Sequence, residues 1–121
     1  MLPVRIINPT TGHHVHAWGL IDTGADDCAL PAAYAALLGH RFRAGVRRVV
    51  ATGNGVTYAY AHTTRIDILA TSGRRVVFTI PDTPIDFMPN LDCVLLGATS
   101  FLRRFIVTIN YPRLYFSIRE P

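Results

Sequence analysis

The sequence contains no lysine. All 12 basic residues among its 121 are arginines, and with 8 acidic residues the formal net charge is +4. A positive balance of this kind favours acidic partners, nucleic acid among them. The arginines are scattered in pairs, however, without the interleaved aromatic residues on which a single-strand nucleic-acid binder stacks bases. We therefore expect no nucleic-acid partner. The pairs are Arg47-Arg48, Arg74-Arg75 and Arg103-Arg104.

Cysteine and long apolar runs are also scarce. Cys28 and Cys93 lie far apart in the sequence among apolar neighbours. Such a setting is typical of small buried hydrophobic side chains, although it leaves a disulfide open. No apolar run approaches the roughly 18 residues that cross a bilayer, and the first residues lack the charged start and apolar stretch of a signal peptide. We expect a soluble cytoplasmic protein with no membrane partner.

The residues that are present are those of a folded β protein. Half of the chain is hydrophobic and 17% is charged, which separates it from disordered sequences. Short stretches rich in Val, Ile, Thr, Tyr and Phe alternate with turn signals. Because this length suits one domain, we predict a single all-β domain over 1–121. The predicted strands are 4–7, 14–21, 46–51, 56–61, 64–69, 75–80, 93–96, 106–110 and 114–118.

Two short segments are expected to be helical and one to be irregular. In the first helix, over 31–38, Pro31 suits the first turn and Gly39 can take the left-handed conformation beyond the last. The second helix is expected over 99–105. The segment 81–90 carries three prolines, too many for a central strand, and is predicted to be a loop.

The strongest chemical signal lies near residue 22. An apolar strand runs directly into an Asp-Thr-Gly turn, where the backbone bends sharply and exposes a carboxylate. Aspartate is common in turns and is often structural there, but this strand followed by Asp-Thr-Gly-Ala-Asp-Asp is far more specific. We take Asp22 as the candidate functional carboxylate. The segment is Gly19-Leu20-Ile21-Asp22-Thr23-Gly24-Ala25-Asp26-Asp27-Cys28.

Two further segments follow in order. Gly53-Asn54-Gly55 is a tight, glycine-rich connection between two predicted strands, as in β-hairpins. Near the C-terminus, Cys93-Val-Leu-Leu-Gly97 is an apolar run that ends on glycine and precedes the second predicted helix. With these three segments in this order, the sequence resembles the retropepsin family, the aspartic proteases of retroviruses and of their cellular and bacterial relatives. We expect a bacterial member.

This resemblance covers nearly the whole chain. It implies a closed, mostly antiparallel, acid-protease-like barrel of a single lobe with one or two short helices. It also implies that Asp22 is the catalytic carboxylate, that the Thr23 hydroxyl ties two active-site loops together, and that the Gly24 backbone meets the substrate main chain. The residues that match substrate-binding positions are Ala25, Asp26, Asp27, Cys93 and Leu95, with Gly53, Asn54 and Gly55 at the tip of a flap.

One Asp-Thr-Gly segment supplies half of an aspartic protease site, because in these enzymes two carboxyl groups share one proton. No other aspartate is followed by Thr-Gly or Ser-Gly, so the second carboxylate must come from another copy, most simply across a two-fold axis. We predict a homodimeric aspartic endopeptidase that cleaves a peptide or protein substrate at acidic to mildly acidic pH, with no cofactor. The aspartates outside the first segment are Asp67, Asp82, Asp86 and Asp92.

Other interpretations of the sequence compete with this one. In viral members, an arginine directly follows the glycine that matches Gly97, and this arginine helps to order their dimer. This chain has Ala98 at that position. The main alternative is a catalytically inactive retropepsin-like module that binds peptides or dimerises, because fold does not guarantee function. His13, His14 and His16 suggest a metal site on one strand, but no nearby cysteine or acid completes a ligand set. We predict a solvated hairpin there and no metal.

Overall fold

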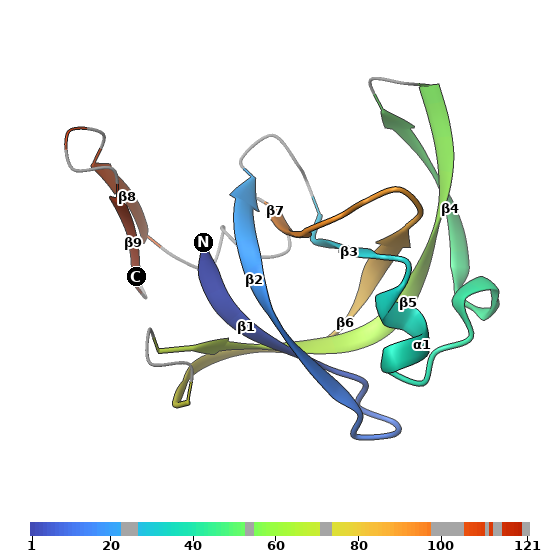
Figure 1. The fold of residues 1–121 in the computed structure, drawn as a ribbon, viewed down its shortest axis with the longest axis horizontal. Helices are drawn as coiled ribbons and strands as arrows, with labels where there is room; N and C mark the ends of the chain where they lie inside the picture. The colour runs from blue at the N-terminus through green and yellow to red at the C-terminus, as the bar shows by residue number, and fades with distance from the viewer. Residues whose placement is uncertain are drawn as a thin grey trace.

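The computed structural model describes residues 1–22, 27–52, 55–70, 74–97, 106–110, 112 and 115–119. Within these residues the chain is built almost entirely from β-strands (Figure 1). The predicted all-β class is confirmed. The elements are β1 (Leu2–Ile7), β2 (His14–Asp22), β3 (Ala29–Pro31), α1 (Tyr34–Leu37), the 3-10 helix η1 (Phe42–Ala44), β4 (Val46–Thr52), β5 (Gly55–Leu69), β6 (Val76–Met88), β7 (Val94–Gly97), β8 (Ile106–Asn110) and β9 (Tyr115–Arg119).

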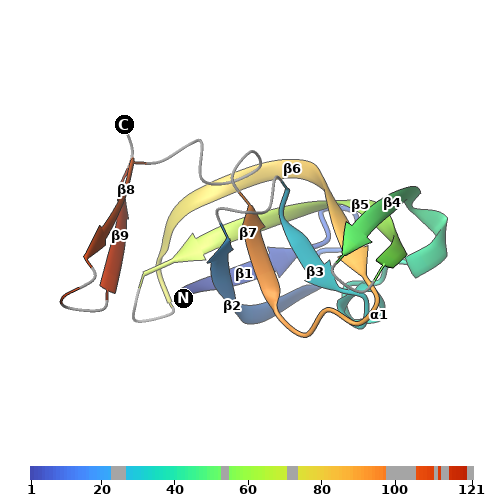
Figure 2. The same ribbon diagram turned by 90° about the horizontal axis from the view of Figure 1, so that it is seen from above.

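Six of the strands close into a barrel. Their order is β1-β2-β7-β3-β6-β5, and β5 pairs back to β1, which leaves β4 attached to β5 outside the ring. The pairs β2–β7 and β3–β6 are parallel, and the remaining pairs of this sheet are antiparallel. Figure 2 shows the ring from above. The closed, mostly antiparallel barrel implied by the family resemblance is therefore confirmed.

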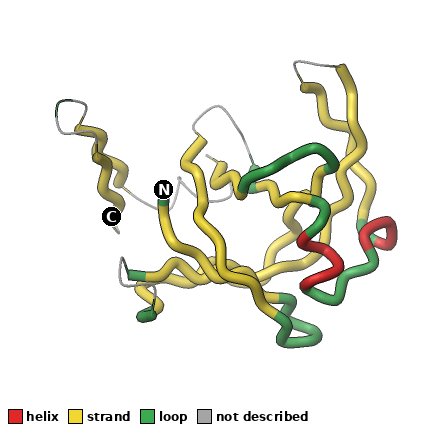
Figure 3. The backbone as a smooth tube through the Cα atoms, viewed as in Figure 1, coloured by secondary structure: helices red, strands yellow, loops and turns green. Residues whose placement is uncertain are grey.

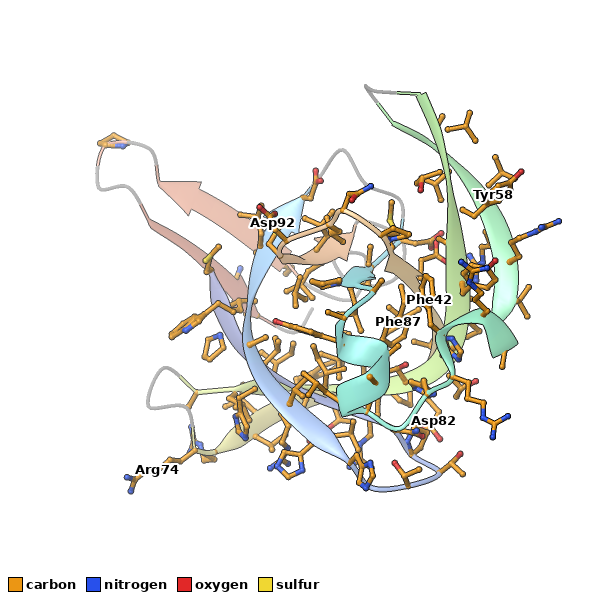
Figure 4. All side chains as sticks on the ribbon, turned by 45° about the vertical axis from the view of Figure 1, so that its right-hand side comes forward. Phe42, Tyr58, Arg74, Asp82, Phe87 and Asp92 are labelled. Atoms are coloured by element: carbon orange, nitrogen blue, oxygen red, sulfur yellow. The ribbon has the colours of Figure 1, made fainter. Side chains whose placement is uncertain are left out.

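The core lies inside this ring. Alternate residues of a strand point to the same face, so each strand sends every second side chain inward. Phe87 of β6 is fully buried, and Figure 4 shows it in the interior, while Tyr58 lies on the outer side of β5. The other large fully buried side chains are Ile6, Leu30, Leu38, Ile66, Ile68, Ile80, Ile85, Leu96, Val4 and Val94.

Strand β5 joins two predicted strands, 56–61 and 64–69, into one of 15 residues. Its first half pairs with β4 and its second half with β1, while β6 runs along it. Thr64, at the junction, is fully buried, and its hydroxyl donates a hydrogen bond to the carbonyl of His62 at 2.8 Å. This pairing keeps the chain extended where the sequence predicts an interruption. The β4–β5 hairpin is consequently the projecting end of a core strand.

The prediction of a loop over 81–90 is wrong for most of its length. Strand β6 runs through both Pro81 and Pro84 to Met88, with a register shift against β5 between Thr64 and Ile66. Such a bulge tolerates proline because the ladder is already interrupted there. At Pro84, among the described strands, β6 pairs with β5 on one side alone, since its pairing with β3 begins at Asp86. Pro81 therefore lies where the ladder is interrupted, and Pro84 where one side of β6 is open.

The first predicted helix is much shorter than expected. Pro31 belongs to β3, and α1 covers only Tyr34–Leu37. Gly39 does take the predicted left-handed conformation, with φ of +76°. The segment before the helix is drawn into the barrel instead, because Leu30 is fully buried and pairs with Phe87 of β6. The second predicted helix, over 99–105, lies outside the described residues.

The last two strands form a separate hairpin. Strands β8 and β9 pair only with each other, and no pairing links them to the barrel among the described residues. Figures 1 and 2 both show this hairpin standing apart from the ring, and Figure 3 shows it at the far end from the helices. No described helix is long enough and apolar enough to cross a membrane.

Candidate active site

Asp22 lies at the C-terminal end of β2, where the strand leaves the barrel. Strand β7 runs parallel to β2 at this point, with Asp22 opposite Gly97 and Ile21 opposite Leu96. The apolar residues before Asp22 thus hold its strand in the sheet, while Asp22 itself is only partly buried. Two of the three sequence segments that indicated an aspartic protease, 19–28 and 93–97, are therefore neighbours in space.

The surroundings of Gly97 explain why the apolar segment 93–97 ends on glycine. A Cβ atom built on Gly97 falls 2.4 Å from the carbonyl oxygen of Asp27 and 2.5 Å from its carbonyl carbon. The backbone of Asp27 therefore packs directly on Gly97, in space that any other side chain would fill. The chain leaves β2 at Asp22 and returns across β7 at Asp27. The predicted site residues Thr23, Gly24, Ala25 and Asp26, and also Gly53 and Asn54, lie outside the described residues.

Cys93 lies close to Asp22. Burial raises the pKa of the Cys93 thiol, and so do the charge of Asp92, a hydrogen bond with Asp92 and the charge of Asp22. Leu95 is partly buried between β2 and β3, opposite Leu20 and Ala29. The charge of Asp22 thus acts on Cys93, and Leu95 lies two residues before the glycine that is opposite Asp22. Cys28 and Cys93 do not form a disulfide.

The β4–β5 hairpin projects from the barrel on the side to which β2 delivers Asp22 (Figure 1). Thr52 pairs with Gly55, and Gly55 has φ of +118°, a backbone conformation that favours glycine. The hairpin exposes several large apolar side chains, a feature that often marks a binding surface. These are Val46, Val49, Val56 and Tyr58.

An ion-pair cluster links the hairpin to the barrel. Arg48 Nε of β4 lies 3.2 Å from Asp86 Oδ1 of β6, and Arg48 Nη1 lies 3.8 Å from Asp27 Oδ2. Asp86 Oδ1 is buried and accepts no hydrogen bond, so its contact with Arg48 is a pairing of charges with poor hydrogen-bond geometry. Burial raises the pKa of Asp86; the Arg48 charge lowers it and the Asp27 charge raises it.

Sequence reasoning missed both Arg48 and Asp86. The only signal for Asp86 is a single acid between two apolar residues, Ile85 and Phe87, in a segment that was predicted to be a loop. The signal for Arg48 is weaker still, because it belongs to one of several arginine pairs. Their proximity follows from the pairing of β6 and β4 with β5, which local sequence does not specify.

A second cluster of titratable side chains lies beneath the hairpin. The rings of His40 and His62 stack with centroids 4.5 Å apart, and Phe87 packs edge-on against both. His62 Nε2 lies 2.8 Å from the carbonyl oxygen of Phe42, to which it donates. The side-chain amide of Asn8 donates to the Leu38 carbonyl at 2.8 Å and lies 3.5 Å from His40 Nδ1. Burial, and then the charge of His62, lowers the pKa of His40.

The histidines of the β1–β2 connection do not assemble with acids or cysteines. His14 and His16 contact each other edge to face at 5.6 Å, and His13 is exposed. In the part of the chain that the structure describes, no three His, Cys, Asp or Glu side chains come close enough to hold a metal ion.

Comparison with known proteins finds a matching family and similar solved structures. A family model described as aspartyl protease matches residues 3–99. Among solved structures, the retroviral protease-like domain of Ddi1 from Leishmania major is similar, with a TM-score of 0.57 and 22% sequence identity over 98% of this chain and 87% of that one. A search of curated proteins gives no match. With Asp22 seated beside Gly97 in a closed six-stranded barrel, the chain belongs to the aspartyl protease family and has the retropepsin-like fold.

Proposed function

We propose that the protein is an aspartic endopeptidase in which Asp22 supplies one of two catalytic carboxyl groups. The observation that carries this proposal is the position of Asp22 opposite Gly97, with the Asp27 backbone packed on that glycine. In aspartic proteases generally, one carboxylate activates a water molecule while the other, protonated, polarises the peptide carbonyl. Two carboxyl groups at close range share a proton because ionising both is costly.

The second carboxyl group comes from another copy of the chain. Within the described residues the buried alternatives are engaged elsewhere: Asp67 accepts hydrogen bonds from Arg5 and Thr79, each at 2.8 Å, and Asp86 faces Arg48. The β8–β9 hairpin supports a dimer. A two-stranded hairpin alone is marginally stable in water, and its open edges can pair with further strands. We therefore place two copies of Asp22 on a two-fold axis.

The substrate is an extended peptide. In the proposed complex it lies between the β4–β5 hairpin, which acts as the flap, and the end of the barrel that carries Asp22. Added strands of this kind bind through their main chain, and pockets for alternate side chains set specificity. We assign Cys93 and Leu95 to such a pocket, because Leu95 belongs to β7, the strand that pairs with β2, and Cys93 directly precedes β7. The hairpin face on the same side as Arg48, a face that also carries Val50 and Thr57, provides the opposite wall.

The decisive experiment is cleavage of a peptide library by the wild type and by Asp22→Asn. Asparagine is nearly isosteric with aspartate but cannot share the proton, so cleavage should fall at least about a thousandfold while the melting temperature stays unchanged. Asp82→Asn is the matched control, because Asp82 is exposed on β6 and Figure 4 shows it at the opposite end of the molecule from the tip of β2. Cleavage by Asp22→Asn at the wild-type rate would exclude Asp22 as the catalyst.

The same cleavage assay, repeated over a dilution series, separates the dimeric enzyme from the inactive module. An enzyme assembled from two half-sites loses specific activity on dilution below its dimer dissociation constant. Constant specific activity, with a monomer in sedimentation at the same concentrations, contradicts the shared site. If the wild type dimerises and binds peptides but cleaves none of the library, the chain is the binding module.

A further inference from the structure

Two carboxylates from separate parts of the chain converge on one arginine. Asp86 belongs to β6 in the barrel wall, Asp27 follows the active-site turn, and Arg48 belongs to β4. The side chain of Asp86 is 11% exposed, against 39% for Arg48 and 50% for Asp27. Asp86 is therefore the fixed end of the cluster. Arginine suits the central position because its planar guanidinium offers several donors at once.

This cluster joins elements that the sheet itself does not join. In the described structure β4 pairs with β5 alone, as the outermost strand. Asp27 is the residue whose backbone packs on Gly97, next to Asp22. Arg48 thus connects the strand that carries the hairpin both to the barrel wall and to the segment that carries the active-site turn. A movement of β4 away from the barrel has to separate Arg48 from these two carboxylates.

We propose that Arg48 is a positioning residue that holds the β4–β5 hairpin over the Asp22 end of the barrel, with Asp86 as its anchor. The proposal rests on the proposed peptidase function, in which this hairpin covers the substrate. Its physical basis is the cost of leaving a buried carboxylate without its compensating charge. Opening the hairpin takes Arg48 away from Asp86 and so incurs that cost. The Arg48–Asp86 ion pair therefore favours the closed position of the hairpin. Arg48 touches none of the reacting atoms.

The link depends on pH in a defined direction. The groups that face Asp86 are Arg48 from β4 and Asp27 ahead of β3, while its pairing partners Ala29 on β3 and Ala61 on β5 carry no charge. Because the pKa of Asp86 is raised, this carboxyl loses its charge at a higher pH than an exposed aspartate does. Acidification therefore releases Arg48 from its anchor before exposed aspartates are protonated.

The test is amide hydrogen exchange of β4 and β5, which needs no catalytic activity, together with peptide kinetics. Arg48→Met keeps the apolar stem of the side chain and removes the charge. It should speed exchange in the hairpin about tenfold and raise KM severalfold, with kcat changed less than about twofold. Asp86→Asn should have the same effect and should also abolish the acceleration of hairpin exchange that acidification causes in the wild type, after correction for the intrinsic pH dependence of exchange.

The matched control is Arg47→Gln. Arg47 is exposed on the other face of β4, where its guanidinium carbon lies 4.9 Å from the ring centroid of Tyr58. In the Arg47→Gln variant, the hydrogen exchange of the hairpin and the peptide kinetics should stay at wild-type values. Hairpin exchange that is unchanged in Arg48→Met, or raised equally in Arg47→Gln, overturns the proposal. If the wild type cleaves no peptide, hydrogen exchange still decides the role of Arg48, and the failure belongs to the proposed function.

Discussion

Replacing Gly97 by alanine tests the arrangement of the site with one methyl group. The new Cβ atom would lie 2.4 Å from the carbonyl oxygen of Asp27, whereas ordinary contact begins at 3.4 Å. The new Cβ atom is fixed to the backbone of Gly97, and the atoms of Asp27 that it meets are also backbone. Neither can rotate away as a flexible side chain can. The segment that carries the active-site turn must therefore move by about 1 Å, a displacement that can cost about a hundredfold in turnover when it reaches the reacting groups.

The expected loss of stability is too small to unfold the Gly97→Ala variant at room temperature. Overpacking of this kind costs about 1–3 kcal/mol. In a chain of this length each kcal/mol lowers the melting temperature by roughly 4 °C, so a fall of about 4–12 °C is expected. Gly97→Ala should remain folded at room temperature with turnover reduced by about two orders of magnitude. The assay is peptide turnover under saturating substrate, beside thermal unfolding of the same sample.

Gly12→Ala is the matched control for this prediction. Gly12 has φ of +78° in the connection that leads into β2, at the opposite end of that strand from Asp22, and no atom lies within 4 Å of its added Cβ. It should lose about 1–2 kcal/mol through backbone strain alone, with turnover unchanged. If Gly97→Ala turns over peptide at the wild-type rate, the packing of Asp27 on Gly97 does not govern the active site and the reasoning fails.

Two further predictions concern the hairpin and the histidine pair. Gly55→Val should lower turnover about tenfold or more with a loss of stability of only about 1–2 kcal/mol, because its φ of +118° resists a β-branched residue while the space around it is empty; equal damage to both would make the turn merely structural. The lowered pKa of His40 means that the unfolded chain takes up this proton first. Stability is therefore complete above the ordinary value of 6.5 and falls as the pH drops from there towards the folded value. His40→Phe should lose less stability between about pH 8 and pH 5 in urea titrations, and an identical slope would contradict the assignment.

Much of the fold could be predicted from local sequence. The strand β1, the hairpin formed by β4 and the first half of β5, and the final hairpin carry alternating apolar residues or turn glycines that specify them independently of the rest of the chain. Asp22 could be chosen because its apolar strand and Thr-Gly turn form a specific pattern. Gly97 could be chosen through the family resemblance, although only the structure shows that its missing side chain accommodates Asp27.

The parts that escaped prediction depend on tertiary register. Strand β3 has three residues and is specified by its burial between β6 and β7, which no local pattern reveals. The prolines of β6 argue against a strand until the register shift between Thr64 and Ile66 of β5 is known. Asp86 is a single acid in a stretch read as a loop, and it acquires meaning only when Arg48 reaches it from β4. In each case the deciding neighbour is distant in the sequence.

The parallel pairing of β2 with β7 also constrains how the molecule comes to fold. It joins residues near the beginning of the described chain to residues near its end, whereas the β4–β5 and β5–β6 pairs join consecutive strands. Closing a long loop costs more chain entropy than closing a short one, and such non-local pairings slow folding. During synthesis Asp22 leaves the ribosome well before Gly97, so a nascent chain that ends before Val94 has no partner for this edge of β2. Asp22 is therefore synthesised well before the strand that pairs with it.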